Sequence, residues 1–324
     1  MAIPMIWIPF VVALCCSLAL TPILARRLRN VGIVGEDVHK ADRRQIPEMG
    51  GLAIIAAFAF GLLIAAALLV FAGTYANASL VGLLAVLATV LLAGIVGVLD
   101  DLLGLPQIVK ALLPIAAALP LMAVRGGDVV MKVPLGGFVD FGIVYSLVLV
   151  PLGVTGAANA FNMVAGFNGL EVGLGLVSFG SLAIIAAHLG QTTSLLILLT
   201  GSGALLGTLV YNWYPARVFV GDVGTLTIGA TIAAAVILGN FETAGVVLFL
   251  PHTVDFAFKA VHGFRKTFGE LRDGKLHCPP DGPKSLPQLV MKLAGGIHER
   301  SLVVSLMGIQ ALFGLLAIAL YLWL

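Results

Sequence analysis

The sequence is poor in charge. Only 10% of its 324 residues are Asp, Glu, Lys or Arg, whereas 60% are hydrophobic. This composition excludes a soluble globular domain and is typical of a polytopic helical membrane protein. Cysteine is also scarce, with Cys15 and Cys16 in the first apolar run and Cys278 in a distant polar loop. Three scattered cysteines provide neither a disulfide framework nor the spacing of a metal site.

Two further features are missing. No basic residue precedes the first apolar run, and Arg26, Arg27 and Arg29 follow it. That polarity is wrong for a cleaved signal peptide, so we expect a retained first span. The sequence shows no internal repeat, which weakens the hypothesis of an inverted-repeat transporter.

What the chain has in abundance is apolar runs of membrane-spanning length. About ten of them occur, at roughly 5–25, 50–72, 78–99, 107–124, 141–158, 169–189, 192–212, 224–240, 243–262 and 301–323. We therefore predict an all-α integral membrane protein with about ten transmembrane helices. An even number of spans places both termini on the same side of the membrane.

The distribution of positive charge predicts the orientation. If the first loop is cytoplasmic, then of the 18 Lys and Arg residues only Arg125 and Lys132 lie in external loops. Cytoplasmic loops carry such an excess of Lys and Arg, so we expect both termini outside. The chain is then one polytopic domain, 1–324, with cytoplasmic loops at about 26–49, 100–106, 159–168, 213–223 and 263–300.

Polar clusters converge on the predicted cytoplasmic face. Asp100 and Asp101 end the third apolar run, where two adjacent carboxylates need a cation or a wet cavity; they could also simply mark the end of a helix. Asp222 lies between Gly221 and Val223-Gly224, which lets a ligand approach the backbone closely. It could instead be the N-cap of a helix.

The three carboxylates have no histidine cluster nearby. Hard oxygen ligands of this kind suit Mg²⁺ or Mn²⁺, and Mg²⁺ commonly bridges carboxylates and substrate phosphates. Asn159, Asn162 and Asn168 suit metal coordination, sugar hydroxyls or a uracil edge, or helix capping. Lys110, Arg265 and Lys266 could contact phosphate; the alternatives are a snorkelling side chain for Lys110 and ordinary positive-inside charge for the other two.

Together these stretches resemble the polyprenyl-phosphate N-acetylhexosamine-1-phosphate transferase superfamily over nearly the full chain, and most of all its archaeal and eukaryotic dolichyl-phosphate branch. The matching motifs are Arg43-Arg44-Gln45-Ile46-Pro47-Glu48, Asp100-Asp101, Lys110, Asn159-Ala-Phe-Asn162 with Gly166-Phe-Asn168-Gly169, Asn212-Trp-Tyr-Pro through Asp222, and His298-Glu299-Arg300. The resemblance implies an active site on the cytoplasmic face. It also implies transfer of GlcNAc-1-phosphate from UDP-GlcNAc to dolichyl or another polyprenyl phosphate, dependent on Mg²⁺ (Mn²⁺ is an alternative).

The resemblance also implies roles for individual residues. Asn162 and Asp222 would hold Mg²⁺, Asp100 would position or deprotonate the lipid phosphate, and Asp101 would orient Lys110, which contacts phosphate. The substrate pocket would be lined by Glu48, Asn159, Gly166, Asn168 and Phe219, with Arg265 on the diphosphate. Partners would be the two substrates and membrane lipid, and no nucleic acid; proteins of this kind are often homodimers, but the sequence itself does not reveal the oligomeric state.

Two alternatives stay open from the sequence. The same chemistry could act on undecaprenyl phosphate. It could also act on another UDP-N-acetylhexosamine, because the loop 263–284 differs from the Pro-Arg-His-Arg stretch that recognises the sugar in the eukaryotic branch. A secondary transporter with an acidic midplane site is the alternative from a different class. Metal-dependent release of UMP distinguishes an enzyme from a carrier.

Overall fold

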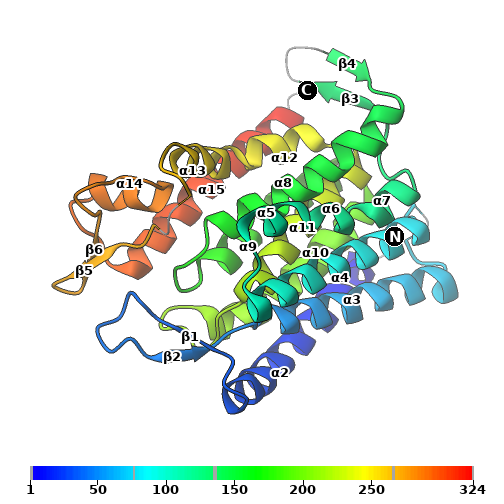
Figure 1. The fold of residues 1–324 in the computed structure, drawn as a ribbon. Helices are drawn as coiled ribbons and strands as arrows, with labels where there is room; N and C mark the ends of the chain where they lie inside the picture. The colour runs from blue at the N-terminus through cyan, green and yellow to red at the C-terminus, as the bar shows by residue number, and fades with distance from the viewer. Residues whose placement is uncertain (1–2, 76, 134–136, 265–266, 323–324) are drawn as a thin grey trace.

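Eight helices in the computed structural model, which describes residues 3–75, 77–133, 137–264 and 267–322, are long and apolar enough to cross a membrane (Figure 1). They are α2 (Ile8–Asn30), α3 (Gly51–Ala72), α4 (Leu80–Leu103), η1 (Tyr145–Leu149) continuing into α8 (Val150–Met163), α9 (Leu170–His188), α10 (Thr192–Asn212), α11 (Gly221–Gly239) and α15 (Glu299–Leu322). The chain is therefore an all-α, multi-pass integral membrane protein.

The other two apolar runs are broken by proline. Run 107–124 forms α5 (Gln107–Leu112), α6 (Pro114–Ala117) and α7 (Leu119–Ala123), and run 243–262 forms α12 (Glu242–Leu248) and α13 (Leu250–Val261), bent by 52°. Pro114, Pro120 and Pro251 each lie in the first turn of a new helix. Proline has no N–H and clashes with the preceding turn, so these two predicted spans are a short apolar segment and a bent helix pair.

Helices also extend into two of the predicted loops. α2 continues to Asn30, so Arg26, Arg27 and Arg29 lie on the helix and not in a loop from residue 26. α8 continues to Met163 and carries Asn159 and Asn162 on its last turns. Both helices continue past the end of their apolar runs because the chain has no glycine or proline beyond those runs until Gly32 and Gly166.

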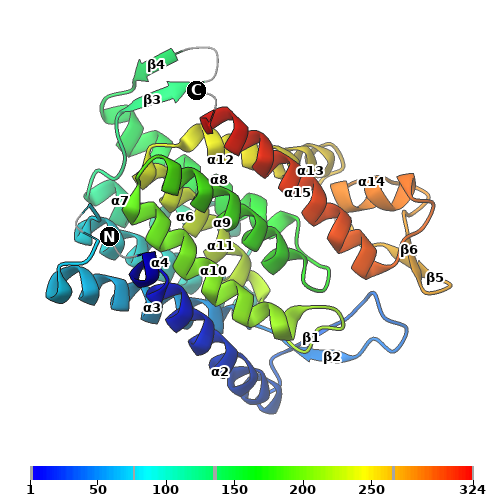
Figure 2. The ribbon, with the colours of Figure 1, turned by 180° about the vertical axis from the view of Figure 1, so that it is seen from behind.

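The short elements gather at the two ends of the bundle. One end carries the hairpin β1 (Val34–Glu36) with β2 (Gln45–Pro47), the hairpin β5 (Glu270–Arg272) with β6 (Lys275–His277), and α14 (Leu286–Leu293) (Figures 1 and 2). The opposite end carries α1 (Ile3–Ile6), the hairpin β3 (Val130–Val133) with β4 (Gly137–Asp140), and both ends of the chain. Which end faces the cytoplasm stays a prediction from charge.

Helix α11 lies at the centre and is the most buried span. It packs on α3, α4, α8 and α10, and small residues allow the close approach. A Cβ added to Gly97 of α4 would lie 2.4 Å from Cα of Val223, and one added to Gly229 would lie 2.3 Å from the carbonyl oxygen of Ala157 on α8. Such contacts bring helix backbones together in lipid, where hydrophobic burial between helices gives little driving force.

Candidate active site

A cavity of about 920 Å³ opens at the end of the bundle that carries β1 and β2. Its walls come from the β1–β2 hairpin, α5, the end of α8, the start of α11 and the segment before β5. Most of the residues proposed from the sequence line it, namely Glu48, Lys110, Asn159, Asn162, Gly166, Asn168, Phe219 and Asp222. The structure thus brings five distant segments of the chain to one site.

A lysine joins two carboxylates at one side of this cavity. The ammonium of Lys110 on α5 pairs with Asp100 at the end of α4 and with Asp222 at the start of α11. Asp100 is buried, and its other oxygen accepts a hydrogen bond from the amide of Leu105 at 3.1 Å. The turn that makes this contact is stabilised by Gly104, whose φ of +59° is the left-handed conformation of a helix end.

Asp101 makes its hydrogen bonds to the start of α11. Its two carboxylate oxygens accept hydrogen bonds from the amides of Asp222 (2.9 Å) and Val223 (3.2 Å), in the first turn of α11. An anion here satisfies unpaired amides and interacts favourably with the positive end of the helix. The ion pairs of Lys110 are with Asp100 and Asp222, so a role for Asp101 in orienting that lysine stays a prediction. Asp222 is not the N-cap either; Asp101 satisfies the amides.

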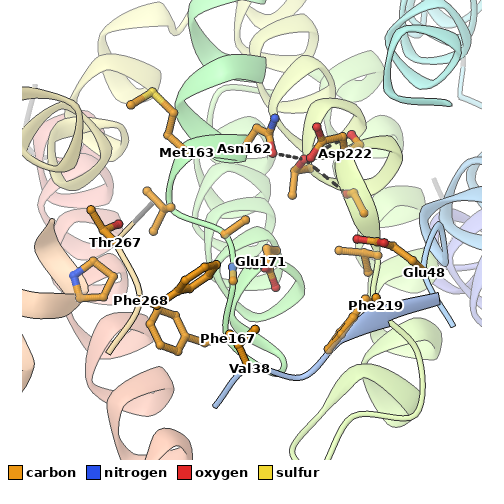
Figure 3. Close-up of a pocket in the computed structure, with 18 of the residues that line it drawn as sticks. Val38, Glu48, Asn162, Met163, Phe167, Glu171, Phe219, Asp222, Thr267 and Phe268 are labelled. Atoms are coloured by element: carbon orange, nitrogen blue, oxygen red, sulfur yellow. Dashed lines mark hydrogen bonds between the residues drawn. The ribbon is translucent and has the colours of Figure 1, made fainter. Parts of the chain in front are cut away.

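Two asparagines on α8 reach the same side of the cavity. Asn162 and Asp222 project toward one another from neighbouring helices (Figure 3), and the hydroxyl of Thr225 donates to Oδ1 of Asn162 at 3.0 Å. Asn159 donates both of its amide hydrogens to backbone carbonyls, those of Ala111 and Thr155, at 3.0 Å each. Asn159 therefore ties α5 to α8, and only its oxygen remains for a ligand.

The same cavity also carries an aromatic ring and a carboxylate. Phe219 and Glu48 lie next to each other there (Figure 3). The backbone of Phe219 is held by two hydrogen bonds, from its amide to the carbonyl of Pro47 (2.8 Å) and from the amide of Gly50 to its own carbonyl (2.7 Å). The β2 segment and the loop before α11 thus position both side chains as one unit.

The loop 164–169 also lines the cavity and is held by acidic residues to which sequence reasoning gave no role in the site. The amide of Gly166 donates to Glu171 (2.7 Å) and the amide of Asn168 to Glu299 (2.8 Å). The side-chain nitrogen of Asn168 donates to Asp37 at 3.1 Å. The charged stretch from Asp37 to Lys40 in the first loop was the available signal, but its spacing carries no indication of these contacts.

His39 packs against the same loop. Its ring stacks on Phe167 with centroids 4.6 Å apart, and burial lowers the pKa of His39 to about 4. The imidazole is therefore neutral at neutral pH. It acts as a flat packing surface that supports Phe167.

The donor set on the Lys110 side fits a hard divalent cation. Asn162 and Asp222 offer an amide and a carboxylate oxygen to the same cavity, and Asp222 is partly exposed to it. Among the described residues, Asp37, His39 and Glu299 also bring ligand atoms within 4.8 Å of one another. The ammonium of Lys40 pairs with the carboxylates of both Asp37 and Glu299, so a lysine already supplies the positive charge in that group.

Arg265 and Lys266, proposed as diphosphate contacts, lie outside the residues that the structure describes. Phe264 and Thr267, on either side of them in the sequence, line the cavity. The role of Arg265 stays a prediction.

Comparison with known proteins points to a family. The sequence pattern of glycosyl transferase family 4 matches residues 83–240. A protein of Saccharolobus solfataricus, provisionally named a UDP-N-acetylglucosamine–dolichyl-phosphate N-acetylglucosaminephosphotransferase, is 36% identical over 99% of this chain and 98% of its own. The Dictyostelium discoideum protein of that name is 30% identical over 66% of this chain and 62% of its own length. A Bacillus subtilis protein, provisionally named an undecaprenyl-phosphate N-acetylglucosaminyl 1-phosphate transferase, is 28% identical over 97% and 84%.

Proposed function

Because this chain belongs to glycosyl transferase family 4, we propose that it transfers GlcNAc-1-phosphate from UDP-GlcNAc to dolichyl phosphate, releasing UMP and forming GlcNAc-diphospho-dolichol. This would be the first step in assembling a lipid-linked oligosaccharide for N-glycosylation. The observation that carries the proposal is the layout of the cavity. It holds a lysine between two carboxylates together with an aromatic ring beside a further carboxylate.

These two groups of residues suit the two parts of the nucleotide, its base and its diphosphate. Phe219 can stack on the uracil ring, while Glu48, Gly166 and Asn168 surround it. Lys110, which lines the same cavity, can contact the diphosphate as a point charge. Such a site binds the nucleotide at both ends and so fixes the position of the phosphorus between them.

Asn162 and Asp222 are the residues that would hold Mg²⁺ in this proposal. When bound there, Mg²⁺ would neutralise charge on the diphosphate and on the oxygen that leaves with UMP. Lys110 contributes positive charge to the same region. Asp101 positions Asp222 through the amides of α11 and has no direct contact with substrate in this scheme.

We propose a single direct displacement. An oxygen of the lipid phosphate attacks the sugar-linked phosphorus, a new P–O bond forms, and the P–O bond to UMP breaks. The second pKa of a phosphomonoester is about 6, so the attacking group is largely ionised at neutral pH and needs no strong base. Asp100 is buried behind Lys110 and bonded to the amide of Leu105, which suits positioning of that lysine better than covalent attack.

The lipid tail needs a route from the bilayer to the cavity. Apolar side chains from α5 and α13, Ile108 and Phe256, line the cavity together with Phe264. The proline break places α13 at 52° to α12. We propose that the polyprenyl chain enters sideways between α5 and α13, because it cannot leave the hydrocarbon.

The experiment is UMP release by purified protein from UDP-GlcNAc, with dolichyl phosphate and Mg²⁺ each omitted in turn. Release that requires both supports the proposal. A series with other UDP-N-acetylhexosamines and with undecaprenyl phosphate then assigns sugar and lipid. No release with any of these from monodisperse protein would contradict an enzymatic function and favour the transporter.

A further inference from the structure

The side-chain amide of Asn168 is held in one orientation by a carboxylate. Asn168 is buried, lines the cavity, and donates from Nδ2 to Oδ2 of Asp37 at 3.1 Å. An ionised carboxylate has acceptors only, so the NH₂ group must face Asp37. The atom of this amide that remains for a ligand is therefore Oδ1, a hydrogen-bond acceptor.

The carboxylate of Asp37 belongs to a cluster of charged residues. Lys40 lies 3.7 Å from Oδ2 of Asp37 and also pairs with Glu299. Glu299 in turn accepts the backbone amide of Asn168 at 2.8 Å. The main chain and the side chain of Asn168 are thus both bound to one buried cluster, and the amide cannot rotate without breaking a hydrogen bond to a charged group.

We propose that Asp37 is a positioning residue that sets the base preference of the cavity for uridine over cytidine. Uracil presents an N–H donor at N3, whereas cytosine presents an acceptor there and an amino donor beside it. An acceptor held at Oδ1 of Asn168 pairs with the uracil N3–H and faces the cytosine N3 unfavourably. This assignment rests on the function proposed above, because it applies to a pyrimidine nucleotide in this cavity.

The substitution Asp37→Asn removes the constraint with little change in shape. An asparagine at position 37 can donate as well as accept, so the amide of Asn168 can turn over and present NH₂ to the base. Asp37→Glu keeps a carboxylate that accepts only. Asp42→Asn makes the same charge change on an exposed residue of the same loop and serves as the matched control.

The test measures two ratios for each protein: kcat/KM for UDP-GlcNAc against CDP-GlcNAc, and the affinity for UMP against CMP by titration calorimetry. We expect Asp37→Asn to lower the uridine preference at least about tenfold, the size of one mismatched hydrogen bond. Asp37→Glu and Asp42→Asn should keep the wild-type ratio. A purely structural role for Asp37 would lower both affinities together and leave the ratios unchanged.

Each other outcome is decisive. A wild-type ratio in Asp37→Asn overturns the assignment and leaves the proposed function intact. Loss of binding of both nucleotides by monodisperse Asp37→Asn, or an equal loss of preference in Asp37→Glu, also overturns it. Absence of UMP release by the wild-type protein would instead contradict the proposed function, and the calorimetric ratio would still decide the role of Asp37.

Discussion

The contact between α4 and α11 at Gly97 should control the geometry of the whole Lys110 side of the cavity. A Cβ added there would lie 2.4 Å from Cα of Val223, whereas ordinary contact begins at 3.4 Å. Gly97→Ala should therefore push the helices apart by about 1 Å at this point. The hydrogen bond from the amide of Asp222 to Asp101, now 2.9 Å, would stretch to roughly 3.9 Å and be lost.

Gly97→Ala should lower activity as well as stability. Displacing a reacting group by about 1 Å can cost about 10²-fold in rate, whereas overpacking typically costs about 1–3 kcal/mol of unfolding free energy. The assay is kcat/KM for UMP release together with thermal unfolding in detergent. Gly180→Ala on α9, where an added Cβ meets nothing within 4 Å, is the control. A Gly97→Ala protein with the wild-type rate would refute this account of how the site is positioned.

Two further predictions concern charge. Lys110→Met leaves Asp100 and Asp222 without their shared cation and should lower kcat/KM for UMP release by at least about 10²-fold. Lys292→Met, at the end of α14, is the control. An unchanged rate in Lys110→Met would contradict the role of Lys110. Burial lowers the pKa of His39 from 6.5 to about 4, so the folded protein favours the neutral imidazole. The stability gained from burying the neutral ring is therefore present above pH 6.5 and is lost as the pH falls toward 4. His39→Phe should therefore lose less thermal stability than the wild type between pH 7 and pH 5, and an identical loss would show that His39 does not titrate as described.

The spans and most of the site residues could be predicted because their signals are local. Long apolar runs identify membrane helices, and polar residues at their ends stand out against a chain with 10% charge. The two runs that fail as continuous helices, 107–124 and 243–262, contain Pro114, Pro120 and Pro251. Apolar length alone does not report that a proline begins a new helix at an angle.

The division of labour within the site could not be predicted because it depends on which atoms meet. Asp100 and Asp101 are neighbours with the same chemistry, yet successive residues of a helix point in directions about 100° apart. One therefore faces Lys110 and the other faces the amides of α11. Asp37 and Lys40 were missed for the same reason, since their partners Asn168 and Glu299 are far away in the sequence.

The most direct test of the proposed reaction follows the phosphorus itself. Purified protein is given UDP-GlcNAc labelled with ³²P on the sugar-linked phosphorus, together with dolichyl phosphate and Mg²⁺. Asp222→Asn is the test variant, and Asp140→Asn on β4, at the opposite end of the bundle, is the control. The account predicts label in the extracted lipid for the wild type and for Asp140→Asn, with loss of that label in Asp222→Asn and on chelation of the metal. Label that stays in the aqueous phase as free phosphate or GlcNAc-1-phosphate, or that remains bound to the protein, would contradict direct transfer to the lipid.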